Sequence, residues 1–251
     1  MKKIVAVLRI SLLICLFSGC DTLQKIAKDA NLPDLLKNTP LTNEEVIRGL
    51  RTALSVGTDT SVNILGKTNG YFSDALVRLA LPPEAQNLVN NLSKIPGGSK
   101  LLSDAILAIN RAAEDAAPQA KQIFVNAITG MSIADGFQIL KGSNTAATEY
   151  LKTKTIQELM NAFTPRIKTS LSKPLVLGVS AETAYTQLID GYNKASLNGV
   201  LFEPIKQNSL SAYTTQKALD GLFIKVADEE RKIRQDPMHR ISEILRRVFG
   251  S

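Results

Sequence analysis

Apolar residues recur at helical spacing along most of the chain, and this periodicity is the feature that most limits its possible folds. In one stripe, Leu102, Ile106, Ile109 and Ala113 stand three or four residues apart. Such spacing places apolar side chains on one face of a helix, which must then pack against other helices. The one strand-like stretch, 175–177, is too short to found a sheet. The sequence therefore predicts an all-α fold: a single bundle-like domain of about ten helices with little or no sheet.

Capping boxes and helix breakers divide this helical pattern into segments. In each box a Ser or Thr is followed three residues later by an acidic residue, so both side chains can bind backbone N–H groups at a helix start. Proline, glycine and clusters of turn residues mark the ends of helices. The boxes are at 42–45, 132–135 and 155–158, and the breaks are at Pro118, Gly142 and the turn-rich stretch 198–209.

The final helix carries a continuous apolar stripe with arginines on its other side. A stripe of this kind is the usual way in which a terminal helix joins a bundle, so we expect this helix to dock on the core. The alternative is a helix that binds a membrane surface or a partner. The stripe consists of Ile241, Ile244, Leu245, Val248 and Phe249.

The first twenty residues are typical of an export signal. Three basic residues precede the apolar run 10–17, which is too short to span a bilayer because a span needs about 20 residues. The next residues end in Ser18-Gly19-Cys20 and resemble the lipobox of bacterial lipoproteins, in which the cysteine thiol receives a diacylglycerol and becomes the first mature residue. We therefore expect a signal peptide at 1–19, a lipidated N-terminus and tether at 20–41, and a helical domain at 42–251. The alternative is a signal anchor in which Cys20 is unmodified.

Lipidation of Cys20 would tether the protein to a membrane that faces the periplasm, since two or three acyl chains give stable anchoring. Asp21, directly after the cysteine, resembles the sorting signal that keeps enteric lipoproteins at the inner membrane. We therefore expect a location in the cell envelope, with the inner membrane preferred over the outer one.

The charge of the chain is modest. Removal of the signal peptide takes away Lys2, Lys3 and Arg9 and lowers the net charge from +7 to +4. Residues 141–175 hold six Lys and Arg against two acidic residues. We interpret them as a solvated helix face, and the alternative is a face that leans on anionic headgroups. Because the excess is small and the chain is exported, we expect no nucleic-acid partner.

Several classes of chemistry find no support. With two cysteines and one histidine, the chain cannot build a disulfide framework or a Cys/His metal cluster, so no cofactor is predicted. Gly66-Lys67-Thr68 resembles the end of a phosphate-binding loop, but Ser61 stands where the first glycine should be, so no nucleotide is expected. Ser170 and Lys173 have the spacing of an acylating serine enzyme, yet no K-T-G triplet follows.

One polar cluster interrupts a helix of small residues: Asn110, Arg111, Glu114 and Asp115. Arg111 lies one turn before the two acidic residues, so an ion pair is within reach. Buried, this pair could shift the pKa of a carboxyl group and make it a general acid. We prefer the interpretation as a polar network that packs helices. The single histidine, His239, follows Asp236-Pro237 and is interpreted as a residue at a helix start.

Several fragments occur along the chain in a fixed order: 110–114 with Pro118, 146–148 with Tyr150, 218–223, 229–230, 233–234, Pro237 and 248–250. Together they resemble an uncharacterised bacterial family, domain of unknown function 4197, over about residues 45–250. The resemblance implies one mostly helical domain of Gram-negative envelope proteins, often with a lipoprotein signal. It implies no activity and no functional residues.

The leading hypothesis is a lipid-anchored, non-catalytic helical module that binds a protein or another envelope component and faces the periplasm. A first alternative is a carrier of an apolar ligand in a pocket between helices. A second is a hydrolase that uses Glu114 or Asp115 with Arg111.

Overall fold

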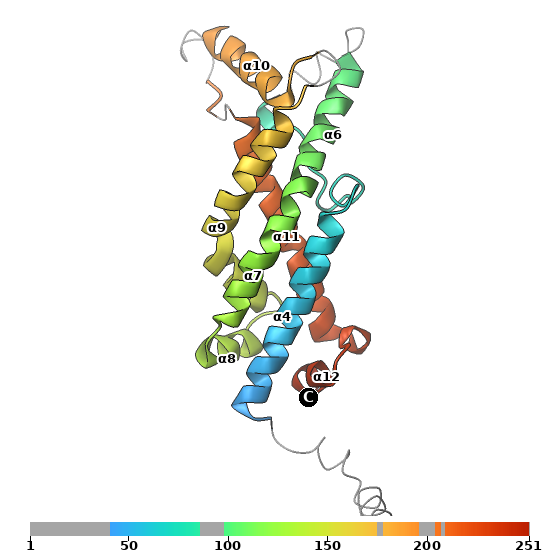
Figure 1. The fold of residues 1–251 in the computed structure, drawn as a ribbon, viewed down its shortest axis with the longest axis vertical. Helices are drawn as coiled ribbons and strands as arrows, with labels where there is room; N and C mark the ends of the chain where they lie inside the picture. The colour runs from blue at the N-terminus through green and yellow to red at the C-terminus, as the bar shows by residue number, and fades with distance from the viewer. Residues whose placement is uncertain (1–40, 86–97, 175–177, 196–203, 207–208, 251) are drawn as a thin grey trace, which may run out of the picture. The chain divides into compact units, whose positions relative to one another are not determined.

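The structure, a computed structural model, describes residues 41–85, 98–174, 178–195, 204–206 and 209–250. The regular structure of these residues is helical, apart from one isolated β-bridge between Pro174 and Ser180. The all-α prediction is confirmed (Figure 1). The elements are α4 (Asn43–Leu65), η1 (Pro83–Ala85), α6 (Gly98–Ala116), η2 (Ala117–Gln119), α7 (Ala120–Thr129), α8 (Ile133–Lys141), α9 (Ala146–Leu171), α10 (Ala181–Ala195), α11 (Leu210–Gln235), η3 (Pro237–His239) and α12 (Glu243–Phe249).

The described helices lie in one compact unit, Asn43–Ser251, and its long helices pack side by side. α11 contacts both α9 and α4, while α6 and α7 cover α9. The short helices α8 and α12 lie at the end of the bundle where α4 begins, and α10 lies at the opposite end (Figure 1).

The apolar stripes of the sequence form the core of this bundle. On α11, the face with Leu219, Leu222 and Val226 is buried. Phe223 of the same helix meets Phe124 of α7 edge to face, with ring centroids 6.0 Å apart. Such aromatic pairs contribute about 1 kcal/mol beyond the area that they bury. The predicted stripes therefore mark the core correctly.

The described residues contain fewer helices than the about ten that were predicted, and one reason is that α9 is a single helix of 26 residues. α9 runs straight through the expected capping box at 155–158, and the Thr155 hydroxyl donates to the Leu151 carbonyl at 2.7 Å instead of capping a helix. The buried residues Leu151, Leu159 and Phe163 continue one stripe across the box. Packing of this stripe outweighs the local preference for a helix start.

Other predicted boundaries are confirmed. Ser132 and Asp135 form a capping box at the start of α8, and α8 ends at Gly142. Pro118 lies in η2, the short break between α6 and α7. α4 begins directly after Thr42, as its sequence predicts.

The terminal helix α12 docks on the bundle, as predicted. Leu245 and Val248 are buried. Val248 lies so close to Gly49 of α4 that a Cβ on Gly49 would come within 2.5 Å of the Val248 Cγ2. Arg247 forms an ion pair with Glu45. Ile241 does not belong to this contact, because it precedes α12 and is exposed.

Some predictions lie outside the described residues: the lipid site Cys20, the sorting residue Asp21, the signal and tether before residue 41, the strand-like stretch 175–177 and most of 198–209. Within the described residues, no single helix is long and apolar enough to cross a membrane, and one bent pair, Ser99–Thr129 with Ile133–Lys141, passes by length and composition alone.

Candidate functional site

Asn110 of α6 is fully buried, and its side-chain amide binds backbone atoms. Its Oδ1 accepts from the Leu79 N–H at 2.9 Å, and its Nδ2 donates to the Leu79 carbonyl at 2.9 Å and to the Ile106 carbonyl at 2.8 Å. The side chain thus pairs with Leu79 as a neighbouring strand would. Asn110 thereby fixes the far end of the connection between α4 and η1.

Glu114, one turn further along α6, is 4% exposed and binds the same connection. Its Oε1 accepts from the N–H groups of Tyr71 and Phe72, both at 3.2 Å. Its Oε2 pairs with Arg111, whose second nitrogen donates to the Asn69 side chain at 2.8 Å. Hydrogen bonds to a charged acceptor are stronger than neutral ones, so this carboxylate is a firm anchor.

These three side chains hold residues 66–80, which we call the clamped loop, against α6. The loop turns at Asn69, whose φ of 69° is left-handed, and Gly70 packs so tightly on the end of α4 that a Cβ would clash with the Ile64 carbonyl. The sequence pattern gave no sign of this arrangement, because the loop has no helical period and its partners are distant in sequence.

Tyr71 fixes the clamped loop to α11 as well. Its ring is buried and its hydroxyl donates to the Ala218 carbonyl at 2.8 Å. A Cβ on Gly221 would come within 2.9 Å of the Tyr71 ring, so only glycine leaves room there. Burial, and to a lesser degree the negative charge of Glu114, raise the pKa of Tyr71 well above its ordinary value of 10.0. The phenol is therefore a neutral packing group.

Asp115 does not join the other three residues of the predicted cluster. Its carboxylate accepts from the Ser170 hydroxyl of α9 at 2.7 Å, on an exposed surface. The serine of the S-x-x-K fragment is thus paired with an acidic residue from the predicted cluster. A carboxylate alone is a weak activator for a serine, which in hydrolases is paired with a stronger base such as histidine.

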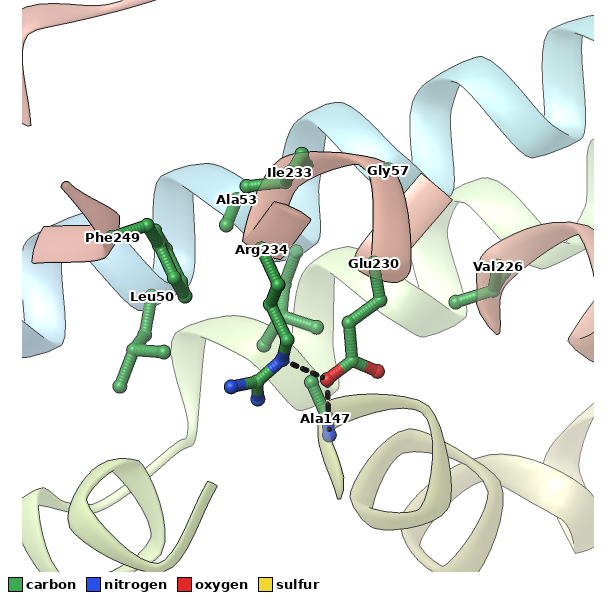
Figure 2. A pocket seen from close by; sticks show the side chains of 10 residues that line it. Leu50, Ala53, Gly57, Ala147, Val226, Glu230, Ile233, Arg234 and Phe249 are labelled. Carbon is green, nitrogen blue, oxygen red and sulfur yellow. Dashed lines mark hydrogen bonds and ion pairs between the residues drawn. The ribbon is translucent and has the colours of Figure 1, made fainter. Parts of the chain in front are cut away.

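A second buried carboxylate, Glu230 of α11, binds the start of α9. It accepts from the N–H of Ala147 at 3.1 Å, and from the N–H and hydroxyl of Thr148, both at 2.8 Å. Arg234 donates to it at 2.9 Å (Figure 2). Arg234 also donates to the Ile139 carbonyl of α8 at 2.9 Å. The N–H groups at a helix start are unpaired within the helix and favour a negative charge, so Glu230 acts as a cap from a distant segment.

Sequence reasoning missed Glu230 as a linking residue. A signal exists, because position 230 falls one turn after the buried Val226 and one turn before Ile233, the next apolar residue of the stripe on α11. A charged residue in such a stripe must be paired when buried.

A small cavity lies beside the Glu230 and Arg234 pair, between α4, α9 and α11. The cavity has a volume of about 20 Å³, enough for about one water molecule. At its side, the Arg234 guanidinium lies 5.8 Å from the centroid of the Phe249 ring. The lining residues are Leu50, Ala53, Leu54, Gly57, Ala147, Val226, Glu230, Ile233, Arg234 and Phe249 (Figure 2).

A third carboxylate repeats the arrangement at the other end of the bundle. Glu182 of α10 accepts from the Ser211 N–H at 2.7 Å and from the Ser209 hydroxyl at 3.0 Å, at the start of α11. Glu114, Glu182 and Glu230 thus each bind the backbone of a segment distant in sequence. No group of three or more His, Cys, Asp or Glu among the described residues has the arrangement of a metal site.

The fragments that resemble the uncharacterised family lie largely at these contacts. Asn110, Arg111 and Glu114 hold the clamped loop, Gly221 receives Tyr71, and Glu230 caps α9. The model of the family described as protein of unknown function (DUF4197) matches residues 40–250. Comparisons with curated proteins and with solved structures gave no match. The chain therefore belongs to the DUF4197 family, which the resemblance of its sequence predicted.

Proposed function

We propose that this protein is a lipid-anchored, non-catalytic module of the cell envelope that binds a protein or another envelope component through the clamped loop. The observation that carries the proposal is the way in which the loop is held. Buried side chains of α6 fix its backbone, and the Tyr71 hydroxyl of the loop donates to a backbone carbonyl of α11. Its outer surface carries groups suited to recognition.

The outer surface of the clamped loop combines apolar and cationic groups. Leu76 is 73% exposed, and the Arg78 guanidinium lies over the Phe72 ring at 4.3 Å from its centroid. Arginine and aromatic side chains are enriched where proteins bind one another, and a rigid loop loses little conformational entropy on binding. An open hollow adjoins them, lined by Phe72, Ser73, Ala75, Arg78, Leu79, Ala80 and Ile106.

The non-catalytic part of the proposal rests on Glu114. A general acid or base must reach the substrate with a free oxygen. Both oxygens of Glu114 are already occupied, one by two backbone N–H groups and the other by Arg111. This geometry favours the packing interpretation of the cluster over a hydrolase.

The serine of the S-x-x-K fragment offers no better site. Ser170 lies near the C-terminal end of α9, about 35 Å along the helix from Ala147 at 1.5 Å per residue. The opposite end of α9, at Ala147, contacts Glu230 near the C-terminal end of α11. The single histidine follows that end of α11, so it is too far from Ser170 to serve as its base.

A carrier of an apolar ligand between the helices is not favoured. The cavity of about 20 Å³ beside Glu230 and Arg234 is far smaller than ligand sites, which enclose about 300–1,000 Å³. The hollow beside the clamped loop has a volume of about 620 Å³, but it is open to solvent and would not enclose an apolar ligand.

In the proposed function Cys20 carries the lipid. The bundle begins at Asn43, and the clamped loop follows α4, which has 23 residues, so the loop begins about 33 Å from Asn43 along the bundle.

A site-specific crosslinking experiment in native membranes tests the binding surface. A photoreactive amino acid at Leu76 should give a crosslinked product of defined mass, whereas the same amino acid at Ile133, an exposed aliphatic position on α8, should not. Equal products at both positions, or none at Leu76, would reject the clamped loop as the binding surface.

Metabolic labelling with palmitate tests the anchor. The wild-type chain should take up the label, and Cys20→Ala should lose it. Label retained in the variant would show that Cys20 is not the lipid site.

A further inference from the structure

The clamped loop ends in a short extended stretch, which we call the edge segment. Burial alternates along it: the first and third side chains are buried and the second and fourth are exposed, in the order Val77, Arg78, Leu79 and Ala80. Such alternation is typical of a β-strand. Asn110 of α6 binds both the N–H and the carbonyl of Leu79, so it covers one edge of this strand-like segment and holds it in place.

The other edge of the segment presents backbone groups without partners. Consecutive residues of an extended chain direct their backbone groups to opposite edges, so the groups of Ala80 face away from Asn110. Among the described residues, no hydrogen bond uses the N–H or the carbonyl of Ala80. Pro82, which has no N–H, stands two residues further along, so this edge suits a short added strand and not a long ladder.

The open hollow of about 620 Å³ adjoins the edge segment, and Ala80 is one of the residues that line it. Its described lining is mostly apolar, with Arg78 as the one charged residue. The Arg78 guanidinium lies over the Phe72 ring and forms no ion pair in the part of the chain that the structure describes. The hollow therefore offers an apolar surface with a cation at its side.

The acidic groups of the neighbouring elements do not neutralise this cation. Asp74, the acidic residue of the clamped loop, pairs with Lys225 of α11. On α6, Asp104 pairs with Lys100. Each of these carboxylates thus has its own cationic partner, and a carboxylate that meets Arg78 must come from elsewhere.

We propose that the edge segment and the hollow bind an extended peptide segment of a partner protein, one that carries an apolar side chain next to an Asp or Glu. The peptide pairs with Ala80 as an added strand, its apolar side chain enters the hollow, and its carboxylate pairs with Arg78. Because Asn110 already holds the edge segment, binding needs little ordering of the loop. This inference rests on the proposed function and names the element of the partner that the clamped loop recognises.

The carboxylate belongs to a side chain and not to the end of a partner chain. Sites for a terminal carboxylate use clustered free backbone N–H groups. In the turn before Arg78 such groups are bound already. The N–H groups of Val77 and Arg78 donate to the Asp74 carbonyl, and that of Leu76 donates to the Asp74 side chain.

Binding of synthetic peptides to the full chain in detergent micelles tests the inference. The probes are peptides of a few residues, blocked at both ends, with one Asp or Glu placed in turn at each position among Val, Leu, Thr and Ser. A matched set carries Asn or Gln instead, and a third set carries a free C-terminal carboxylate without Asp or Glu. Arg78→Gln removes the cation of the hollow. Arg48→Gln is the matched control, because Arg48 is an exposed arginine of α4 outside the clamped loop.

We expect the tightest acidic peptides to bind about tenfold or more tightly than their Asn or Gln counterparts, because only the acidic ones form an ion pair with Arg78. This preference should vanish in Arg78→Gln and persist in Arg48→Gln. A preference that survives in Arg78→Gln would overturn the inference, and so would binding by the third set alone or by no set.

N-methylation of the tightest peptide tests the strand pairing. Methylation of the residue opposite Ala80 should weaken binding about tenfold, whereas methylation of either neighbour should change it little, because neighbours direct their N–H groups to the other edge. Hydrogen exchange at the Ala80 amide should also slow when peptide is bound. Equal effects at adjacent residues, or unchanged exchange at Ala80, would show that the peptide does not add as a strand.

Crosslinking at Leu76 keeps the two proposals apart. A partner that crosslinks there, together with no preference for acidic peptides, leaves the proposed function standing and overturns only this inference. No crosslinked partner at Leu76 rejects the proposed function, whichever peptides bind.

Discussion

Substitution of Glu114 by glutamine separates a structural from a catalytic role for the buried cluster. Glutamine keeps the shape of the side chain and one oxygen acceptor for the Tyr71 and Phe72 N–H groups, but it removes the charge. Its amide would also point N–H donors at the Arg111 guanidinium, which is a donor as well. If Glu114 holds the clamped loop, the variant must lose stability.

The magnitude follows from the contacts. A hydrogen bond to a charged group contributes about 1.5–3 kcal/mol, and the part that comes from Arg111 is reduced because this side chain is 37% exposed. We therefore expect Glu114→Gln to lower the free energy of unfolding by about 2 kcal/mol, which corresponds to a fall in Tm of about 4–8 °C for a domain of this size. Glu114→Ala leaves two N–H groups without an acceptor and should cost about 3 kcal/mol.

Chemical denaturation followed by circular dichroism measures this loss. Asp115→Asn is the matched control, because Asp115 is the next residue of α6 and its only described contact is the exposed one with Ser170. We expect that variant to remain within about 0.5 kcal/mol of wild type. Hydrogen exchange at the Tyr71 and Phe72 amides should become faster in Glu114→Gln. If Glu114→Gln proves as stable as Asp115→Asn, the clamp does not depend on Glu114 and the reasoning is wrong.

Three further predictions concern other parts of the fold. Glu230→Ala should lower the free energy of unfolding by about 3 kcal/mol, since buried N–H groups at the start of α9 lose their acceptor; a loss below about 1 kcal/mol in a denaturant titration would contradict this. Gly49→Ala should destabilise the fold by about 1–3 kcal/mol, because the new Cβ meets the stiff side chain of Val248. Gly191→Ala in α10 should stabilise the fold by up to about 1 kcal/mol, because open space surrounds that position. The Tm shifts of the two variants must therefore have opposite signs. A hydrogen bond from Lys225 of α11 holds the pKa of Asp74 below its ordinary value of 3.8. The contribution of Asp74 to stability is therefore complete above about pH 4 and is lost as the pH falls through the folded-state pKa. Asp74→Asn should flatten the acid side of the curve of stability against pH, and an unchanged curve would refute this prediction.

The sequence predicted those parts of the fold that depend on local pattern. The box at Ser132 caps a helix because nothing in the neighbouring residues competes with it. The box at Thr155 does not, because a buried stripe passes through it and the helix gains more from continuous packing than from a new start. A capping pattern thus predicts a helix start only where the apolar period also breaks.

The candidate cluster was predicted as a set of residues but not as an arrangement. The spacing placed Arg111 and Glu114 on one face of a helix, and the ion pair is present. The segment that they hold is 40 or more residues away in sequence, at Asn69 and Tyr71. Single-sequence periodicity carries no information on such pairs, so the clamped loop could not be deduced. The stripe on α11 indicates that Glu230 needs a partner, but it does not indicate that the partner is the start of α9.

The place of these contacts in the fold changes what membership of the family implies. Glu114, Glu230 and Gly221 join segments that are distant in sequence, and each is buried or tightly packed. The carboxylates among them are occupied by a fixed backbone, so the resemblance at these positions is explained by the fold. Under the proposed function, we expect binding to depend on exposed residues outside those fragments. Leu76 on the clamped loop is such a residue, and we expect its substitution to change binding while leaving the fold intact.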